Sequence, residues 1–354
     1  MMKHIDLRSD TVTHPPPEMK KAMFEAELGD DVFGDDPTVK ELEALAAQML
    51  GKEAGLFVPS GCMGNQLALF THCTQGQEVI IPDDCHTVVY EAGGAAIISK
   101  VQLRTLQTDE GKMDLNLVKS KIRRDPNDPH FPSTGLIWVQ TPSGPGYVLS
   151  LEYLQKLKEI AEADKIPVHM DGARIFNAAA YLGVEAKDIA QYADSVMFCL
   201  SKGLCCPVGS MIVGTKEFIE KARRNRKMLG GTMRQVGILA AAGIYALKNL
   251  AGRVGEDLKT AKLLAKELSN NMHGLVTVLR EPQINMVFFK VNHKSFDHDD
   301  FVKYMLEKGI KIIAPSKGTD VWRFATHYYI GEKEAMTVIE HMREYLGKLV
   351  SGEQ

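Results

Sequence analysis

The stretch IPVHMDGARIFNAAAYLGVEAKDIAQYADSVMFCLSK, residues 166–202, holds two short apolar runs on either side of a helical pattern. The runs, 166–174 and 195–202, have the length and composition of buried strands, and residues 174–182 have the spacing of a helix. A strand, a helix and a second strand in this order are typical of a parallel pair joined by a crossover helix. This unit predicts a sheet with helices on both faces.

The same alternation extends over the first two-thirds of the chain, which predicts an α/β fold with a mostly parallel sheet flanked by helices. Further strands are expected at 55–61, 78–84, 95–99, 135–142 and 209–214. Further helices are expected at 61–74, 86–93, 114–123, 150–164 and 215–228.

Beyond residue 255 the order of elements changes and predicts a smaller α+β domain. Its strands are expected at 284–291, 310–314 and 321–327, and its helices at 255–271, 299–308 and 332–348. The first residues are polar and contain the run HPPPE. We therefore expect an N-terminal arm (1–28), a large domain (29–254) and a small C-terminal domain (255–354).

The composition is that of an ordinary soluble protein of about two domains, with 354 residues of which 45% are hydrophobic and 25% charged. A net charge of −3 gives no reason to expect nucleic acid or an anionic membrane as a partner. The N-terminus has no apolar signal core, and the six cysteines show no zinc or redox spacing. A cytoplasmic location with reduced thiols is the expectation.

Three predicted strands end in residues that carry chemistry: Ser60, Asp171 and Lys202. Ligands of open parallel sheets collect at the carboxyl ends of the strands. A small-residue turn, a buried acid and a lysine at that edge suit a cofactor with a phosphate, a basic ring nitrogen and an aldehyde. That description fits pyridoxal 5′-phosphate, which no one of the three residues would indicate alone.

Each residue has a chemical reason and a plain structural alternative. Desolvation lowers the pKa of an amine toward the range in which it forms an imine, whereas Lys202 alone would be taken for a surface lysine in a turn. Asp171 suits a protonated ring nitrogen, and Arg174 could reach the ring oxygen or a substrate carboxylate. The alternative for this DGAR segment is a helix cap with a local ion pair.

The turn PSGCMGNQ, 59–66, would offer backbone N–H groups and a helix N-terminus to a phosphate, although many helices begin this way. His86 at the start of a predicted helix could stack on the ring or move a proton. His130 on a proline-rich loop could serve a substrate hydroxyl. Surface histidines are the alternative at both positions.

With these residues in view, the sequence resembles the low-specificity L-threonine aldolases, which are aminotransferase-like enzymes of fold type I in the β-eliminating lyase group. The resemblance covers most of the chain and rests on long motifs: IDLRSDTVT (5–13), GDDVFGDDPTVKELE (29–43), EAGGAA (91–96), HMDGARIFNAAA (169–180), ADSVMFCLSKGLCCPVGSMIVG (193–214), RKMLGGTMRQVGILAAAGIYAL (226–247) and RFATH (323–327).

The resemblance implies a role for each candidate residue. Lys202 would carry the imine, Asp171 would pair with the ring nitrogen, and His86 would stack on the ring. Arg174 would contact the ring oxygen or the substrate. Phosphate ligands would be Ser60, Gly61, Cys62 and Arg234, and the substrate carboxylate would meet Ser9 and Arg323. Lys227 would come from a second subunit, which implies a homodimer or homotetramer with shared active sites.

The implied reaction is the reversible cleavage of L-threonine, L-allo-threonine and related β-hydroxy-α-amino acids to glycine and an aldehyde. The general base is left open between His86, His130 and a bound water. Three departures from the family pattern concern specificity: QTPSGPG at 140–146, Cys62 in place of a threonine, and Ser133 near the place of an arginine.

Other functions are considered beside this one. The same cofactor would serve β-elimination or racemisation of a small amino acid. A metal-dependent hydrolase would use His86, His130, His169 and Asp171, since His169 and Asp171 share one side of a strand. That reading leaves Lys202 and the phosphate turn unexplained, as does a non-catalytic binding protein, and no metal is expected.

Overall fold

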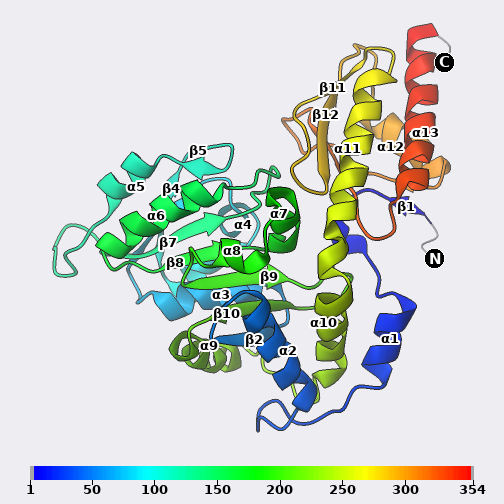
Figure 1. Ribbon diagram of the computed structural model, residues 1–354. Coiled ribbons are helices and arrows are strands. Elements are labelled where there is room, and N and C mark those ends of the chain that lie inside the picture. The colour runs from blue at the N-terminus through cyan, green and yellow to red at the C-terminus, as the bar shows by residue number, and fades with distance from the viewer. Residues whose placement is uncertain (1–3, 352–354) are drawn as a thin grey trace. The chain divides into compact units, whose positions relative to one another are not determined.

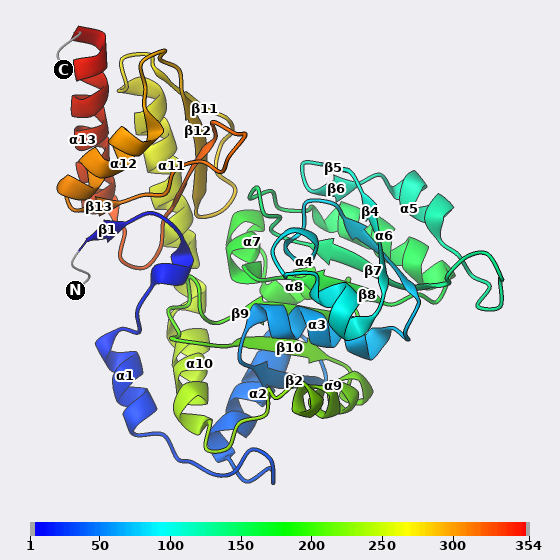
Figure 2. The same cartoon turned by 180° about the vertical axis from the view of Figure 1, so that it is seen from behind.

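The computed structural model describes residues 4–351 (Figures 1 and 2). The chain divides into two compact units, one from Pro15 to Ala251 and the other from the N-terminal residues up to His14 together with the segment from Gly252 onward. The residues expected to form an arm, 1–28, are shared between the units. Within residues 4–351, no helix has the length and apolar character that crossing a bilayer requires.

The unit Pro15–Ala251 is built on a seven-stranded sheet. In spatial order the strands are β2 (Ala54–Val58), β10 (Ser210–Gly214), β9 (Ser195–Cys199), β8 (Val168–Asp171), β7 (Thr134–Gln140), β3 (Glu78–Pro82) and β4 (Gln102–Leu106). Strand β10 runs in the direction opposite to the other six strands of this sheet, which all run the same way. Asp171 lies opposite Gln140 of β7 and Met197 of β9, so these three strands end near one edge. The predicted mostly parallel sheet is confirmed.

Helices cover both faces of this sheet (Figures 1 and 2). Helices α3 (Gly61–His72) and α9 (Lys216–Met228) pack on one face over an apolar core that includes Trp138 and Phe218. Helices α6 (Leu151–Ala163) and α8 (Ala186–Ala190) lie on the other face. The unit also contains α1 (Pro17–Phe24), α2 (Pro37–Met49), α4 (His86–Val89), η2 (Ala95–Ser99), β5 (Thr108–Asp109), β6 (Lys112–Met113), α5 (Leu115–Lys121), α7 (Ile175–Leu182) and α10 (Gly237–Asn249).

Local sequence explains where the main helices begin. At α2, α3, α6 and α9 a short polar side chain accepts a hydrogen bond from a backbone N–H of the first turn, which fixes the start of the helix. These N-cap residues are Asp36, Ser60, Ser150 and Thr215. Because Ser60 also ends the turn after β2, the N-terminus of α3 is set at the carboxyl edge of the sheet.

The strand predicted at 95–99 is wrong. This segment forms the short π-helix η2, which packs against α3, and the strand of that region is β4, Gln102–Leu106. An apolar run of five residues has no periodicity that separates a strand from a helical turn. Ile97 is largely exposed here, so its apolar side chain did not mark a buried strand.

The second unit contains a three-stranded antiparallel sheet, β11 (Val276–Val278), β12 (Met286–Val291) and β14 (Trp322–Ala325). Near its N-terminal end, β1 (Ile5–Asp6) pairs in parallel with β13 (Ile310–Lys311), which ties the first residues to this unit. Its helices are η1 (Asp10–Val12), α11 (Val254–Asn270), α12 (His298–Glu307) and α13 (Glu332–Ser351), and η3 (Ala251–Arg253) precedes α11. Its core is rich in aromatic side chains, including Trp322, Phe289 and Phe301.

A buried acid makes the stability of this second unit depend on pH. Burial raises the pKa of Asp257 from 3.8 to about 6, against the opposing effect of Arg253, whose Nη2 lies 2.7 Å from Oδ1. Because the folded pKa exceeds the unfolded one, the folded state binds the proton more tightly, and stability is lost as pH rises through about 6.

We expect Asp257→Asn to remove this dependence. The difference in free energy of unfolding between wild type and variant should therefore change by up to about 3 kcal/mol between the unfolded pKa and the folded pKa of Asp257. Each unit contains one of the two tryptophans, so urea unfolding followed through Trp322 in a Trp138→Phe background reports this unit. A wild-type-minus-variant difference that stays constant from pH 4 to pH 7.5 would show that Asp257 does not titrate there.

Candidate active site

Four of the predicted residues gather at the carboxyl edge of the seven-stranded sheet. Asp171 is the last residue of β8, and Lys202 follows β9, the neighbouring parallel strand. Ser60 stands between β2 and α3, and His86 begins α4 after β3. Since parallel strands present their carboxyl ends at one edge, the fold brings together residues far apart in sequence.

Asp171 is fully buried, and its carboxylate is only partly satisfied. Oδ2 accepts a hydrogen bond from Asn65 Nδ2 at 3.0 Å, and Oδ1 accepts one from the backbone N–H of Ala173 at 3.1 Å. Burial raises the pKa of Asp171, the positive charge of Lys202 lowers it, and the negative charge of Glu91 raises it. A carboxylate has about four acceptor positions, so this group retains capacity for a cationic N–H donor.

The loop after β9 is tightly held around Lys202. The backbone N–H groups of Leu200 and Ser201 both donate to the carbonyl of Gly209, at 3.1 and 3.3 Å. The carbonyl of Lys202 accepts from Cys205 at 2.9 Å, and Cys205 has the left-handed φ of 62°. Lys202 itself is half-buried. This loop therefore gives the lysine a fixed backbone position beside the end of β8.

The turn before α3 offers a helix N-terminus to an anion. Ser60 is exposed and its Oγ accepts from the backbone N–H of Met63 at 3.2 Å. A Cβ at Gly61 would lie 3.0 Å from Cys199 Sγ, so a glycine lets α3 approach β9. Burial, with the nearby charge of Glu91, raises the pKa of the Cys62 thiol. The free N–H groups of this first turn suit a phosphate.

Glu91 is buried and its carboxylate meets three polar side chains, although the sequence did not indicate it as a site residue. Its Oε1 accepts from Asn65 Nδ2 at 2.7 Å and lies 2.9 Å from His86 Nδ1, and its Oε2 accepts from Gln66 Nε2 at 2.8 Å. Asn65 Nδ2 reaches both Glu91 and Asp171, so one amide links the acid at the strand end to the histidine. Asn65 and Gln66 sit on the buried face of α3, where helical spacing alone marks no function.

The segment that departs from the family pattern also touches the site. Gln140, the last residue of β7, is buried, and its Oε1 accepts from the backbone N–H of His86 at 3.3 Å. Ser133 instead precedes β7, and its Oγ accepts from Gln77. The two departures therefore lie at opposite ends of one strand, and only Gln140 supports the histidine.

His130 lies on an exposed loop before β7, with its backbone N–H bonded to Asp128. Asp171 lies at the other end of the adjacent parallel strand. Seven residues of strand, from Thr134 to Gln140, separate the two edges by roughly 20 Å. Within one copy of the chain, His130 therefore stands at the edge opposite Asp171.

Other predicted residues lie at the surface of the same unit. Arg234 is exposed, its Nη1 donates to Asp30 at 2.8 Å, and its guanidinium lies 5.9 Å from the ring of Phe33. Lys227 is exposed near the end of α9. Arg174 is half-buried at the N-cap of α7, three residues after Asp171.

Ser9 and Arg323 belong to the second unit. Ser9 caps η1, and its Oγ accepts from the N–H and the hydroxyl of Thr11. Arg323 lies in β14, and its Nη2 donates to the carbonyl of Arg8 at 3.0 Å. The fold of this unit thus brings the predicted arginine beside the residue that precedes Ser9.

The alternative metal set of His86, His130, His169 and Asp171 is not assembled. The ring of His169 is fully buried, its Nδ1 lies 2.7 Å from Ser195 Oγ, and its centroid is 4.3 Å from that of Trp138. Burial holds the pKa of His169 well below its usual value. Within residues 4–351, the group of three or more potential metal ligands whose ligand atoms all lie within 4.8 Å of one another is Cys62, His86 and Glu91, in the site just described.

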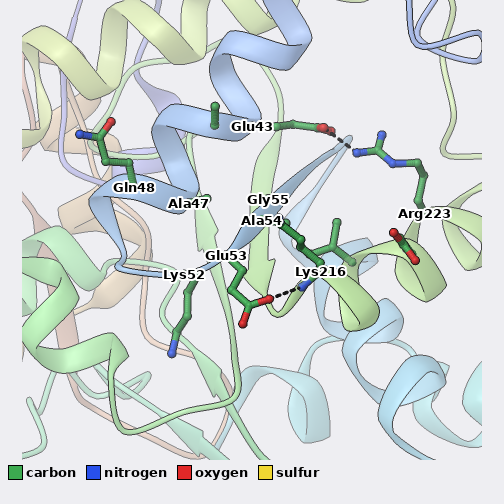
Figure 3. A pocket seen from close by; sticks show the side chains of 12 residues that line it. Glu43, Ala47, Gln48, Lys52, Glu53, Ala54, Gly55, Lys216 and Arg223 are labelled. Atoms are coloured by element: carbon green, nitrogen blue, oxygen red, sulfur yellow. Dashed lines mark hydrogen bonds and ion pairs between the residues drawn. The ribbon is translucent and has the colours of Figure 1, made fainter.

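A pocket of about 480 Å³ lies elsewhere in the same unit, between α2, the start of β2 and α9 (Figure 3). Two of its acidic side chains have partners: Glu43 pairs with Arg223 at 2.6 Å, and Glu53 accepts from the backbone N–H of Lys216 at 3.0 Å. Because Ala54 begins β2, this pocket opens near the amino end of that strand, whereas Ser60 follows its carboxyl end. None of the predicted site residues lines it.

The site combines a buried acid, a lysine on a fixed loop and a helix N-terminus suited to a phosphate, all on an α/β sheet. These features define a class of cofactor-dependent α/β enzyme. Comparison with known proteins agrees. The beta-eliminating lyase family model matches residues 6–294. Low-specificity L-threonine aldolase 1 of Arabidopsis thaliana is 45% identical over 88% of both chains. The low specificity L-threonine aldolase of Escherichia coli strain K12 is 42% identical over 97% of this chain and all of its own.

Solved structures show the same fold. A threonine aldolase of Leishmania major superposes with a TM-score of 0.80 over 97% of this chain and 99% of its own, at 17% identity. The chain belongs to the beta-eliminating lyase family, within the group of low-specificity L-threonine aldolases.

Proposed function

We propose that this protein is a pyridoxal-phosphate-dependent aldehyde lyase that cleaves L-threonine, L-allo-threonine and related β-hydroxy-α-amino acids to glycine and an aldehyde. The observation that carries the proposal is the buried carboxylate of Asp171, at the strand end beside the loop of Lys202, in a chain at least 40% identical to several threonine aldolases. When bound, the cofactor would draw the electrons of the breaking bond into its protonated ring.

Asp171 and Lys202 fit the two reactive ends of that cofactor. The spare acceptor capacity of the buried Asp171 carboxylate suits a ring N–H⁺, and the charge pair would offset the desolvation that raises the pKa of this acid. Lys202, on its fixed loop, would hold the aldehyde carbon covalently. Ser60 and the backbone N–H groups of Gly61 and Cys62 would bind the phosphate.

The remaining residues would bind and orient the amino acid. The family resemblance assigns the substrate carboxylate to Arg323 and Ser9 and the ring oxygen to Arg174, and we propose the same roles for them. In the reaction the β-hydroxyl proton passes to a base, the Cα–Cβ bond breaks, the aldehyde leaves, and the carbon left behind takes a proton to give glycine. Of the two candidate histidines, His86 is the one that lies at the same edge of the sheet as Asp171 within one copy of the chain.

Self-association is part of the proposal. Lys227 is exposed, as the proposal that it serves the active site of a neighbouring copy in a homodimer or homotetramer requires, and Arg234 and His130 are exposed as well. Several large apolar side chains of the same unit are also exposed, which favours a protein interface. They include Phe24, Phe33, Tyr90 and Ile97, with exposed fractions from 71% to 89%. The six free cysteines suit a reducing compartment, and we propose a cytoplasmic location.

The products formed from L-threonine and L-allo-threonine test this function. We expect glycine and acetaldehyde in equal amounts, measured by amino-acid analysis and by aldehyde-dependent oxidation of a nicotinamide cofactor. Ammonia with a 2-oxo acid would instead indicate β-elimination, and a D-amino acid would indicate racemisation. Either result would replace the aldolase function while leaving the cofactor assignment intact.

A further inference from the structure

The three small residues that follow Glu91 allow its side chain to be buried. Ala92 and Gly93 both have left-handed backbone, with φ of 52° and 75°, and this conformation is unfavourable for alanine. A Cβ at Gly94 would lie 2.9 Å from the amide of Gln66, so a glycine there leaves room for the side chain that holds Oε2 of Glu91. The side chain of Glu91 is 1% exposed as a result.

The hydrogen-bond partners of Glu91 determine which ring nitrogen of His86 carries a hydrogen. Three amide or hydroxyl donors point at the carboxylate, from Asn65, Gln66 and, at 3.4 Å, Thr87. A carboxyl group surrounded by donors is an ionised acceptor, because a protonated one would bring its own O–H against them. His86 Nδ1, 2.9 Å away, must then carry a hydrogen and donate it.

We propose that Glu91 is a positioning residue that holds His86 in the Nδ1–H tautomer and leaves Nε2 as a proton acceptor. The role in catalysis rests on the proposed aldol cleavage, in which Nε2 would take the hydroxyl proton of the substrate, whereas the tautomer itself does not depend on the reaction. Through Asn65, which bridges Glu91 and Asp171 at 2.7 and 3.0 Å, the orientation of the histidine is also tied to the acid at the ring nitrogen.

Nitrogen-15 NMR of histidine-labelled protein tests the tautomer directly. Spectra are recorded for apoenzyme and cofactor-loaded enzyme above the pH at which imidazoles ionise, with EDTA present so that no cation occupies Cys62, His86 and Glu91. The signal of His86 is assigned as the one missing from His86→Asn. We expect the Nδ1–H form in wild type and a shift toward the Nε2–H form in Glu91→Gln, whose amide can also donate. An Nε2–H form in wild type, or a spectrum unchanged in Glu91→Gln, overturns the proposal.

Kinetics of the loaded enzyme measure the consequence. We expect Glu91→Gln to lower kcat about 10- to 100-fold with KM nearly unchanged, as removal of a supporting hydrogen bond typically does. The matched control is Glu78→Gln, which alters another buried carboxylate at the amino end of β3, paired with Arg104 and Arg123, and should leave kcat intact. If wild type performs another reaction, the NMR result still decides the role of Glu91, so the two failures are distinguishable.

Discussion

Lys202→Ala is expected to abolish the visible absorbance of the cofactor-loaded protein and to lower kcat for L-threonine cleavage by on the order of 10³-fold or more. The amine of Lys202 is the proposed covalent attachment point, and the fixed loop between Leu200 and Gly209 carries it beside the end of β8. Alanine leaves the backbone hydrogen bonds of this loop in place, so the fold should be retained.

The matched control is Lys248→Ala, an exposed lysine of α10 in the same unit that pairs with Glu41. It should keep both the absorbance band and the turnover. Absorbance between 300 and 500 nm and glycine formation are measured on both variants, with circular dichroism to check folding. Wild-type turnover by Lys202→Ala would remove the lysine from the mechanism.

Asp171→Asn is expected to weaken cofactor binding about 10- to 100-fold, the effect of losing one charge-assisted hydrogen bond, and to lower kcat by roughly 10²-fold. Asparagine has nearly the same shape and can still accept from the N–H of Ala173. The loss would therefore report the missing negative charge opposite the ring nitrogen. Cofactor affinity is measured by fluorescence titration of the apoenzyme.

The stability of the apoenzyme separates this loss from misfolding. Burial raises the pKa of Asp171, so its charge disfavours the folded apoenzyme above that pKa, and wild type should gain stability relative to Asp171→Asn as pH falls. At neutral pH we expect the variant to be no less stable than wild type. Asp194→Asn gives the opposite pattern, because Asp194 pairs with Lys158 and caps the N–H of Val168 at the amino end of β8. It should lose stability and keep the cofactor.

Much of the architecture was predictable because parallel strands carry unmistakable apolar runs. The ends of those runs located Asp171 and Lys202, and the topology then required the two to meet at one edge. The turn at Ser60 was predictable for the same reason. The error at 95–99 arose because a five-residue segment lacks the length that distinguishes a strand from a π-helical turn.

The supporting residues of the site were not predictable. Asn65 and Gln66 occupy ordinary buried positions of α3, and their function appears only when the fold sets Glu91 against them. The pairing of β1 with β13 was also hidden, because a two-residue strand gives no pattern. The signal that could have located Glu91 is its position directly before three small residues, AGG, of which two adopt left-handed backbone.

The central claim is that one covalent bond joins pyridoxal phosphate to Nζ of Lys202. Borohydride reduction of the purified, cofactor-loaded protein, followed by proteolysis and mass spectrometry, tests it most directly. The account predicts that the visible band disappears and that a single peptide containing Lys202 gains the mass of the reduced phosphopyridoxyl group. A modified peptide that contains another lysine, or none modified at all, would contradict it.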